Sequence, residues 1–211
     1  MGMMEIRRRI ILGENNSGKI PKEYQEVEYI ESGNGDAYII TDCITDNMVG
    51  ARWGCSFAGS IPSMEKCVFG WLGSGSEQGF YADFYGSKFY GAVLNSRYRN
   101  KIGITHDIKY DCYMDGFTLN IGDYTQSPEY TGSSNAPSNM GIFCANKNGE
   151  PFWIASNMRL YYLKIYSGDT VIADYVPCYR RSDGEIGMYE VKSGRFYKNK
   201  GNGSFTKGKE I

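Results

Sequence analysis

The segment FYADFY (residues 80–85) is followed, after a two-residue Gly-Ser turn, by KFYGAVL (residues 88–94). In the first segment the even positions are Phe, Ala and Phe, and the odd positions are Tyr, Asp and Tyr. A period of two is the pattern of a β-strand with one buried and one open face, and the short turn predicts a hairpin. We therefore expect the two phenylalanines to pack against a second sheet, and Tyr81, Asp83 and Tyr85 to face solvent or a ligand.

The whole chain has a composition typical of β-proteins. Its 211 residues include 18 Tyr and 10 Phe, which favour strands, and 27 Gly, which allow frequent tight turns. Short aromatic and β-branched runs alternate with clusters of Gly, Asn, Asp and Ser, as in an all-β sandwich. No stretch holds a helical period for three turns. The expected strands are 26–31, 37–41, 51–58, 66–72, 80–85, 88–94, 110–114, 116–121, 140–145, 158–166, 170–176, 187–191 and 195–198.

The chain divides into an N-terminal arm and one domain. Residues 1–19 contain three consecutive arginines and a polar Gly-Asn-Ser stretch, and they cannot build a core alone. Residues 20–211 carry the strand-like segments and are long enough to bury a core without metals or disulfides. Residues 122–139 contain Ser-Pro and Asn-Ala-Pro sequences, which predict a long surface loop.

Charge and cysteine usage exclude several classes of protein. A formal net charge of −1 and a pI near 5.9 argue against nucleic-acid binding, which needs a basic surface. No apolar run approaches the length of a membrane span, and residues 1–25 lack the features of a secretory signal. Six scattered cysteines with no C-x-x-C pair are therefore expected to be free thiols, mostly buried, in a protein made in a reducing cytosol.

One motif imitates a nucleotide-binding loop. Residues 13–19 have the G-x-x-x-x-G-K spacing of a phosphate-binding loop. That loop needs Ser or Thr after the lysine and then a helix, but Ile20 and Pro21 follow here. The spacing is explained as a polar linker, and no nucleotide is expected.

A second motif resembles a glycosidase strand. Glu26, Glu28 and Glu31 are close to the E-x-D-x-x-E arrangement of jelly-roll glycosidases. Retaining hydrolysis needs two carboxyls about 5–5.5 Å apart, and here the central Asp is missing and Glu31 falls on the opposite face unless a bulge intervenes. Polar residues on an edge strand explain the segment more simply, although a glycoside hydrolase stays open as a minor alternative.

Other catalytic and metal constellations are weak. His106 is the one histidine of the chain, so a hydrolase triad is hard to assemble, and its neighbours predict an exposed loop. Asp111 and Asp115 would come close together around a hairpin and bind calcium through oxygen ligands, but two carboxylates without a defined loop are weak support. We therefore expect no enzyme activity, no catalytic residues, no metal site and no cofactor.

Aromatic side chains are the remaining candidates for binding. Flat rings stack on sugar rings, and Asn, Asp and Gly-rich loops hydrogen-bond hydroxyls. Tyr90 lies on the second strand of the hairpin and joins the open face of Tyr81, Asp83 and Tyr85. These four residues are the first candidates for a carbohydrate site. Trp71 and Trp153 are the next candidates.

Two parts of the chain resemble a known family. IPKEYQEVEYIES (residues 20–32) is similar to the opening of tail-associated proteins from phages and prophages of Gram-positive gut bacteria, which carry a concanavalin A-like, laminin-G-type jelly roll. The basic arm also looks like the one that precedes such domains. Residues 42–157 carry no such resemblance. The longer match comprises RLYYLKIY (159–166), DYVPCYRRSDGEIGMY (174–189), GRFY (194–197) and GNGSF (201–205).

The resemblance implies a jelly-roll sandwich of two antiparallel sheets, like that of concanavalin A-like lectins and glucanases. It also implies a virion tail component, made in the bacterial cytoplasm, that binds carbohydrate on a host surface without catalysis. Residues 1–19 would then contact other tail proteins, and a homo-oligomer is an option. The alternative is a structural tail module that decorates or joins tail parts through protein contacts only.

Overall fold

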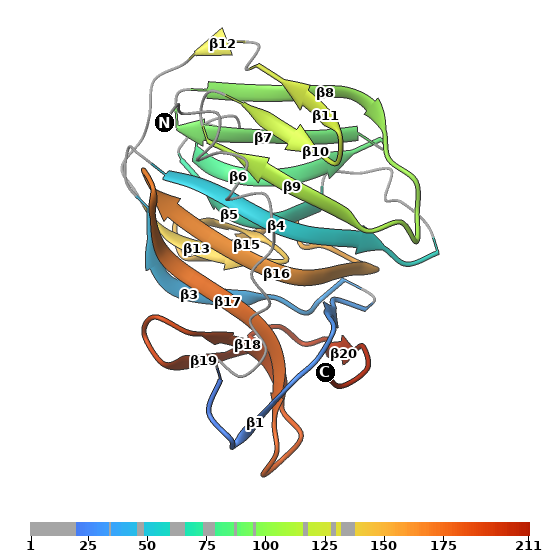
Figure 1. Cartoon of the computed structure of the whole chain (residues 1–211), viewed down its shortest axis with the longest axis vertical. Helices are drawn as coiled ribbons and strands as arrows, with labels where there is room; N and C mark the ends of the chain where they lie inside the picture. The colour runs from blue at the N-terminus through green and yellow to red at the C-terminus, as the bar shows by residue number, and fades with distance from the viewer. Residues whose placement is uncertain are drawn as a thin grey trace, which may run out of the picture.

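The computed structural model describes residues 20–33, 35–45, 49–59, 66–73, 79–86, 88–94, 96–115, 118–127, 130–131 and 138–211. Within these residues the fold is all-β, with two sheets and no helix, as the sequence predicts (Figure 1). The described part therefore offers no helix of the length and apolarity needed to cross a membrane. The arm at residues 1–19, with its nucleotide-loop spacing, lies outside the described residues.

The larger sheet, here sheet I, has 11 strands. Its main path runs in the order β11-β10-β9-β4-β16-β17-β18-β19, with β1 beside β17 and β2 between β16 and β20. Every pairing in it is antiparallel. The bounds are β1 Tyr24–Glu26, β2 Ile30–Glu31, β4 Val49–Phe57, β9 Tyr110–Met114, β10 Leu119–Ile121, β11 Tyr124–Gln126, β16 Met158–Ser167, β17 Thr170–Arg180, β18 Ile186–Glu190, β19 Arg195–Lys198 and β20 Thr206–Lys207.

The second sheet, sheet II, has 9 strands in the order β12-β8-β7-β6-β5-β13-β3, with the hairpin β14–β15 attached to β5. Asn146 of β14 pairs with Trp71 of β5 in a parallel bridge, whereas the other pairings are antiparallel. The bounds are β3 Ile39–Ile44, β5 Lys66–Leu72, β6 Gly79–Tyr85, β7 Lys88–Leu94, β8 Ser96–Gly103, β12 Tyr130–Thr131, β13 Asn139–Ile142, β14 Ala145–Lys147 and β15 Glu150–Phe152.

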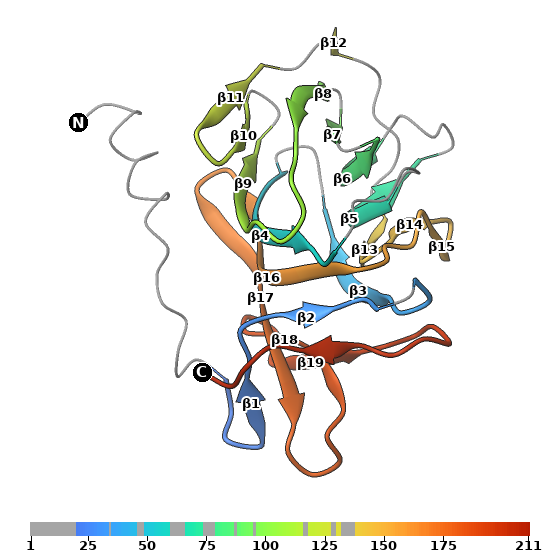
Figure 2. The same ribbon diagram turned by 90° about the vertical axis from the view of Figure 1, so that its right-hand side faces the viewer.

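The hydrophobic core lies between the two sheets. In Figure 2, β9, β10 and β11 of sheet I lie on one side of the molecule, and β5, β6 and β7 of sheet II lie on the other. Aromatic rings bridge the gap: Trp53 of β4 meets Phe69 of β5 at 5.0 Å, and Phe57 of β4 meets Phe84 of β6 at 4.3 Å, both edge to face. Burying each such side chain contributes about 1.5–3 kcal/mol to folding, so this contact between sheets is consistent with a β-sandwich.

Most long strands were predictable from their pattern, but the eight-residue strand β8 and the short edge strands were not expected. The expected strands 66–72, 88–94, 110–114 and 195–198 are confirmed with their bounds. The expected loop at 122–139 is wrong in part, because it contains β11, β12 and the start of β13. Strands of two or three polar residues hold too few alternations to be distinguished from turns.

All six cysteines are free, and all but Cys43 are buried, as expected. Cys43 itself is half-buried on β3. Burial raises the pKa of its thiol to about 11, with the charge of Glu190 acting in the same direction and a hydrogen bond with Tyr175 opposing it.

This shift predicts slow alkylation of Cys43. At pH 8 a thiol with this pKa is ionised in about one molecule in a thousand, compared with roughly a quarter for an ordinary cysteine. We expect iodoacetamide to label folded Cys43 about 100-fold more slowly than a model thiol, and the rate to rise as the pH approaches 11. Mass spectrometry of the labelled peptide measures it, with protein unfolded in urea as the control. Rapid labelling of the folded protein at pH 8 would contradict the predicted burial.

Candidate functional site

The structure brings most of the sequence-predicted residues together on the outer face of sheet II. Tyr81, Asp83 and Tyr85 alternate with core residues along β6, so they share one face of the sheet. Asp83 lies opposite Tyr90 of β7, and the Tyr85 and Tyr90 rings meet at 6.2 Å. The hairpin and its register therefore follow the prediction.

The expectation that this face is open is wrong. Tyr81 is 2% exposed and Asp83 is 3% exposed, whereas Tyr85 at the end of β6 is 51% exposed. The reason is a second small core, in which Tyr81 packs with Cys67, Leu72 and Ala145 on the outer side of sheet II. Local alternation cannot reveal such a cover, because β14 and β15 join the sheet from more than 60 residues away in the sequence.

Both tryptophan candidates pack against other residues of the fold. Trp71 is fully buried in the main core and donates its indole N–H to Thr45 Oγ1 at 2.6 Å, so it does not reach a surface. Trp153 is half-buried against Tyr81, with ring centroids 5.8 Å apart, and has a φ of 52°. A bulky side chain rarely takes a positive φ, so surrounding contacts must hold Trp153 in this conformation.

A different cluster lies on the outer face of sheet I, and we call it the tyrosine face. It consists of the rings of Tyr29, Tyr161 and Tyr162 and the polar residues beside them, which are Glu31, Arg52, Ser56, Asp107, Lys109, Asp111 and Arg159. Its origin is a β-bulge in β16, where the register with β4 shifts between Leu160 and Tyr162. Leu160 and Leu163 both remain in the core. The extra residue therefore places Tyr161 and Tyr162 together on the outer side, and a bulge of this kind commonly redirects side chains beside functional sites.

The Tyr162 ring packs against a glycine. A Cβ on Gly54 of β4 would come 2.8 Å from the Tyr162 ring, so the absence of a side chain there makes room for the ring. The Tyr162 hydroxyl donates a hydrogen bond to Asp111 Oδ1 at 2.8 Å. Lys109 Nζ lies 5.8 Å from the centre of this ring. Burial raises the pKa of the Tyr162 hydroxyl, and the charge of Asp111 raises it further, so the group stays protonated and keeps donating.

Tyr161 continues the row of rings. Its ring meets that of Tyr29 edge to face at 5.4 Å, and Lys109 Nζ lies 4.8 Å from its centre. The hydroxyls of Tyr161 and Ser56 are hydrogen-bonded at 3.1 Å. These contacts orient the Tyr161 ring before any ligand arrives, and a fixed ring loses little conformational entropy on binding.

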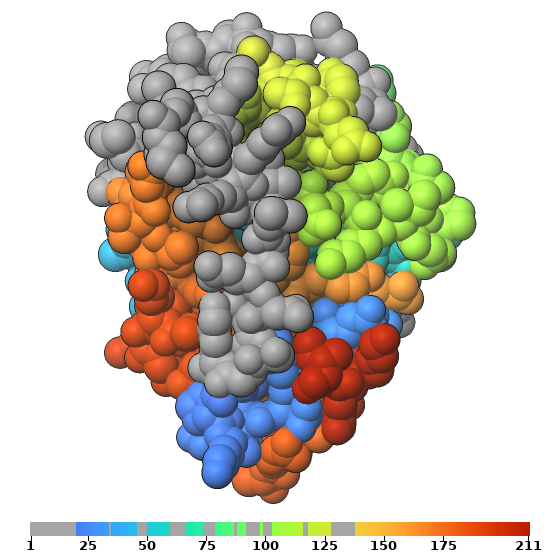
Figure 3. All heavy atoms as spheres, viewed as in Figure 1, coloured from blue at the N-terminus to red at the C-terminus, as the bar shows by residue number. Residues whose placement is uncertain are grey.

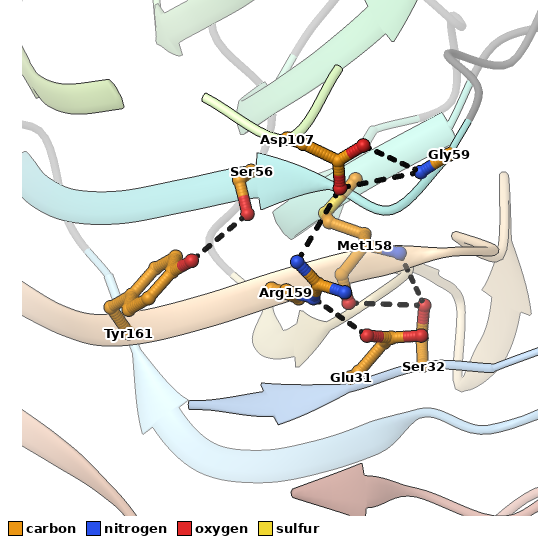
Figure 4. Close-up of polar contacts among 8 residues, drawn as sticks. All are labelled: Glu31, Ser32, Ser56, Gly59, Asp107, Met158, Arg159 and Tyr161. Atoms are coloured by element: carbon orange, nitrogen blue, oxygen red, sulfur yellow. Dashed lines mark hydrogen bonds and ion pairs between the residues drawn. The ribbon is translucent and has the colours of Figure 1, made fainter. Parts of the chain in front are cut away.

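Arg159 lies between the carboxylates of Glu31 and Asp107 (Figure 4). Its guanidinium lies 5.0 Å from the Tyr29 ring, donates from Nε to Glu31 Oε2 at 2.7 Å, and reaches Asp107 Oδ1 from Nη1 at 3.5 Å. The hydrogen bond to Glu31 is the main cause of the raised pKa of Arg159. Two carboxylates from separate segments therefore hold one guanidinium at the edge of the rings.

Asp107 is fixed by its own backbone and neighbours. It has a φ of 58°, its N–H donates to Phe57 O at 2.7 Å, and both of its carboxylate oxygens accept from the N–H of Gly59. His106 Nδ1 lies 2.9 Å from Asp107 Oδ2. This hydrogen bond is the largest cause of the lowered pKa of Asp107, so the carboxylate is ionised at neutral pH. His106 itself is exposed in a loop, as the sequence indicates.

The four segments that form the tyrosine face are far apart in the sequence and adjacent in space. In Figure 3 the green residues 103–115 adjoin the orange of β16, and the blue of residues near β2 follows below. Sheet pairing confirms this order, since β16 has β4 on one side and β2 on the other, and β9 lies beside β4.

A scan against protein-family models and a search of curated proteins found no match. Function is therefore argued from these residues and their contacts.

The weaker sequence candidates do not assemble into catalytic or metal geometry among the described residues. Glu26 lies on β1 beside Cys178, whereas Glu31 lies on β2 beside Arg159, so the acidic trio is not one strand. Asp111 and Asp115 lie four residues apart along β9 and its end, and Asp115 accepts from Thr118 and Tyr113 instead. No group of three potential metal ligands occurs within the described residues.

Tyr161 and Tyr162 lie in a segment that resembles the tail-protein family, but the sequence predicts no site there. Two adjacent tyrosines in an otherwise alternating strand were the one local signal, since they break the period of two as a bulge does. Nothing in the local sequence links them to Tyr29 or to Asp107.

Proposed function

We propose that this two-sheet protein is a concanavalin A-like jelly roll that binds carbohydrate without catalysis, through the tyrosine face. The observation that carries the proposal is the bulge that places Tyr161 and Tyr162 side by side, next to Tyr29, on the outer face of a sheet. Aromatic faces stack on the C–H faces of sugar rings, while the surrounding polar groups hydrogen-bond hydroxyls.

The setting we propose follows from the family resemblance. It is a tail protein of a phage or prophage that contacts carbohydrate on a bacterial host surface, with residues 1–19 contacting other tail proteins. Affinity for one site would be millimolar to micromolar, and several copies on one particle would raise the overall affinity. This setting accounts for a module that needs many weak, reversible contacts.

The Tyr85–Tyr90 pair on sheet II is the second candidate place for a sugar. Tyr85 is exposed and Tyr90 is half-buried, so the pair offers one accessible ring beside another. The burial of Tyr81 and Asp83 reduces the rest of that face to a structural role. Sheet I is preferred because its rings are surrounded by exposed hydrogen-bonding groups.

A structural module that works through protein contacts only is the second candidate function. The observation that favours it is the cover over the sequence-predicted face, where Tyr81 packs in the small outer core and Asp83 is buried. This function predicts that the protein binds no glycan at any concentration, so the titration below separates the two proposals.

The test of the proposed function is a titration of Tyr161→Ala. We expect glycan affinity to fall at least about tenfold, a loss of about 1.4 kcal/mol, because the central stacking ring is removed. Tyr161→Phe keeps the ring, loses only the contact with Ser56, and should retain most of the affinity. Calorimetry with glycans selected on an array measures the affinity, and circular dichroism verifies the fold.

Two further variants test whether the glycan site lies on sheet I or on sheet II. Phe152→Ala removes an exposed ring from the β14–β15 hairpin and is the matched control, for which no change is expected. Tyr85→Ala tests the second candidate place. Loss of affinity in Tyr85→Ala with none in Tyr161→Ala would move the site to sheet II, and absence of binding by the wild-type protein would overturn the proposal.

A further inference from the structure

The charged groups of the tyrosine face are balanced. Three cations, Arg52, Lys109 and Arg159, lie at the rings. Three carboxylates, those of Glu31, Asp107 and Asp111, lie beside these cations. With His106 counted as neutral at pH 7, the formal charges of these six residues cancel.

Arg159 is already occupied on two sides. Its side chain is 25% exposed and that of Glu31 is 18% exposed, so their contact at 2.7 Å is largely removed from water. An incoming sulfate, phosphate or carboxylate must either displace Glu31, leaving that partly buried charge without its partner, or approach against the charges of Glu31 and Asp107. Both routes are unfavourable, because separating one member of a desolvated pair costs more than a surface pair contributes.

The other two cations are engaged as well. Lys109 Nζ lies 3.9 Å from Asp111 Oδ1 and also over the rings of Tyr161 and Tyr162. Arg52 lies within hydrogen-bonding reach of the Tyr162 hydroxyl, which itself donates to Asp111. Lys109 and Arg159 are therefore each held between an aromatic ring and a carboxylate, and Arg52 is held at the Tyr162 hydroxyl.

A neutral hydroxyl group fits this arrangement without breaking it. The side chains of Asp107, Asp111 and Lys109 are 50%, 57% and 45% exposed, so they keep free hydrogen-bonding capacity on their solvent side. A sugar hydroxyl can donate to a carboxylate and accept from an ammonium at the same time. The rings of Tyr161 and Tyr162 supply the apolar surface for the sugar C–H groups.

We infer that the ligand of the tyrosine face is an uncharged glycan, and that the paired carboxylates exclude acidic sugars. The inference rests on the proposed carbohydrate-binding function and adds the substrate class to it. Its physical basis is that the attractive charges are already matched within the protein. Specificity then comes from hydroxyl geometry and ring stacking, with acidic competitors rejected by repulsion.

The experiment compares neutral and acidic oligosaccharides on the full chain. The neutral probes are maltoheptaose and N-acetyl-chitohexaose, and the acidic probes are oligogalacturonate and a heparin hexasaccharide, each within a wider array. We expect only neutral glycans to bind, with an affinity that changes by less than about twofold between about 50 mM and about 500 mM NaCl. Preferential binding of acidic glycans, weakened more than about tenfold by salt, would overturn the inference and leave carbohydrate binding intact. No binding of either class would overturn the proposed function, and the inference with it.

A variant with two carboxylates removed tests whether repulsion by these carboxylates excludes acidic glycans. Replacing Asp107→Asn together with Asp111→Asn leaves the rings in place and gives the face a net positive charge. We expect acidic oligosaccharides to bind this variant at least about tenfold more tightly than they bind the wild-type protein. The matched control is Asp183→Asn, which breaks a comparable pair with Arg180 at 2.6 Å outside the tyrosine face and should not change acidic binding. An unchanged affinity for acidic glycans in the double variant would refute the exclusion.

Discussion

Replacing Gly70 with alanine is expected to abolish stable folding. Gly70 lies on β5 with a φ of 138°, in the region that favours glycine. A Cβ there would lie 2.2 Å from the carbonyl oxygen of Phe80 and 2.5 Å from the Cα of Tyr81. Both are backbone atoms of the neighbouring strand β6, so no side-chain rotation can relieve the clash. The two strands would have to separate at the centre of sheet II.

The expected loss for Gly70→Ala is at least about 4 kcal/mol, a large part of the stability of an ordinary domain. Urea unfolding followed by tryptophan fluorescence measures it, or the soluble yield where the variant does not fold. Gly103→Ala on β8 is the control, because its Cβ would meet nothing within 4 Å and its φ is not positive. We expect that control to change stability by less than about 0.5 kcal/mol. A Gly70→Ala variant within about 1 kcal/mol of the wild type would show that β5 and β6 are less tightly paired than described.

The β6–β7 hairpin shows how much of this fold was predictable. Period-two alternation predicted both strands and the inward direction of Phe80 and Phe84, and the structure confirms these and the antiparallel pairing of the strands. All of that information is local, because alternation and turn chemistry are properties of adjacent residues. The clearest error was the expected open face, because Ala145 and Trp153 from a distant segment pack on Tyr81.

The tyrosine face could not be predicted for the same reason. Its residues come from 29–31, 52–56, 107–111 and 159–162, segments that adjoin only through the pairing of β2, β4, β9 and β16. Strand order in a sheet is set by the packing of the whole chain, and alternation within one strand does not specify it. The contact of Arg159 with Asp107 joins residues 52 apart in sequence, and its contact with Glu31 joins residues 128 apart.

Trp153→Ala is expected to lower stability by about 2 kcal/mol, the second large effect. The ring packs on Tyr81 and lies 5.1 Å from Phe152, and the Trp153 carbonyl accepts the N–H of Cys67 at 2.8 Å. Removing the ring opens the small core on the outer side of sheet II, which large-to-small substitutions of aromatic residues do at a cost of about 3–5 kcal/mol when the side chain is fully buried. The expected loss lies below this range because Trp153 is only half-buried.

The positive φ of Trp153 also determines whether alanine or glycine is tolerated better at this position. Glycine adopts a φ of 52° without strain, whereas alanine does not, so Trp153→Gly should be less destabilised than Trp153→Ala by about 0.5–1 kcal/mol. At most strand positions the order is reversed, because glycine is the more flexible residue in the unfolded chain. Parallel urea unfolding of the two variants measures the difference, and the usual order would show that the backbone relaxes when the ring is removed.

Glycan binding by the same two variants decides what Trp153 does. If the ring stabilises the cover over Tyr81 and the sugar site lies on sheet I, both variants should keep the wild-type affinity at a temperature where they remain folded. A variant that keeps its stability and loses glycan binding would instead make Trp153 a ligand contact, as its sequence first indicates, and would place the site on sheet II. Each outcome changes one measurement and leaves the other unchanged, because removing a core ring weakens folding whereas removing a ligand-contacting ring weakens binding.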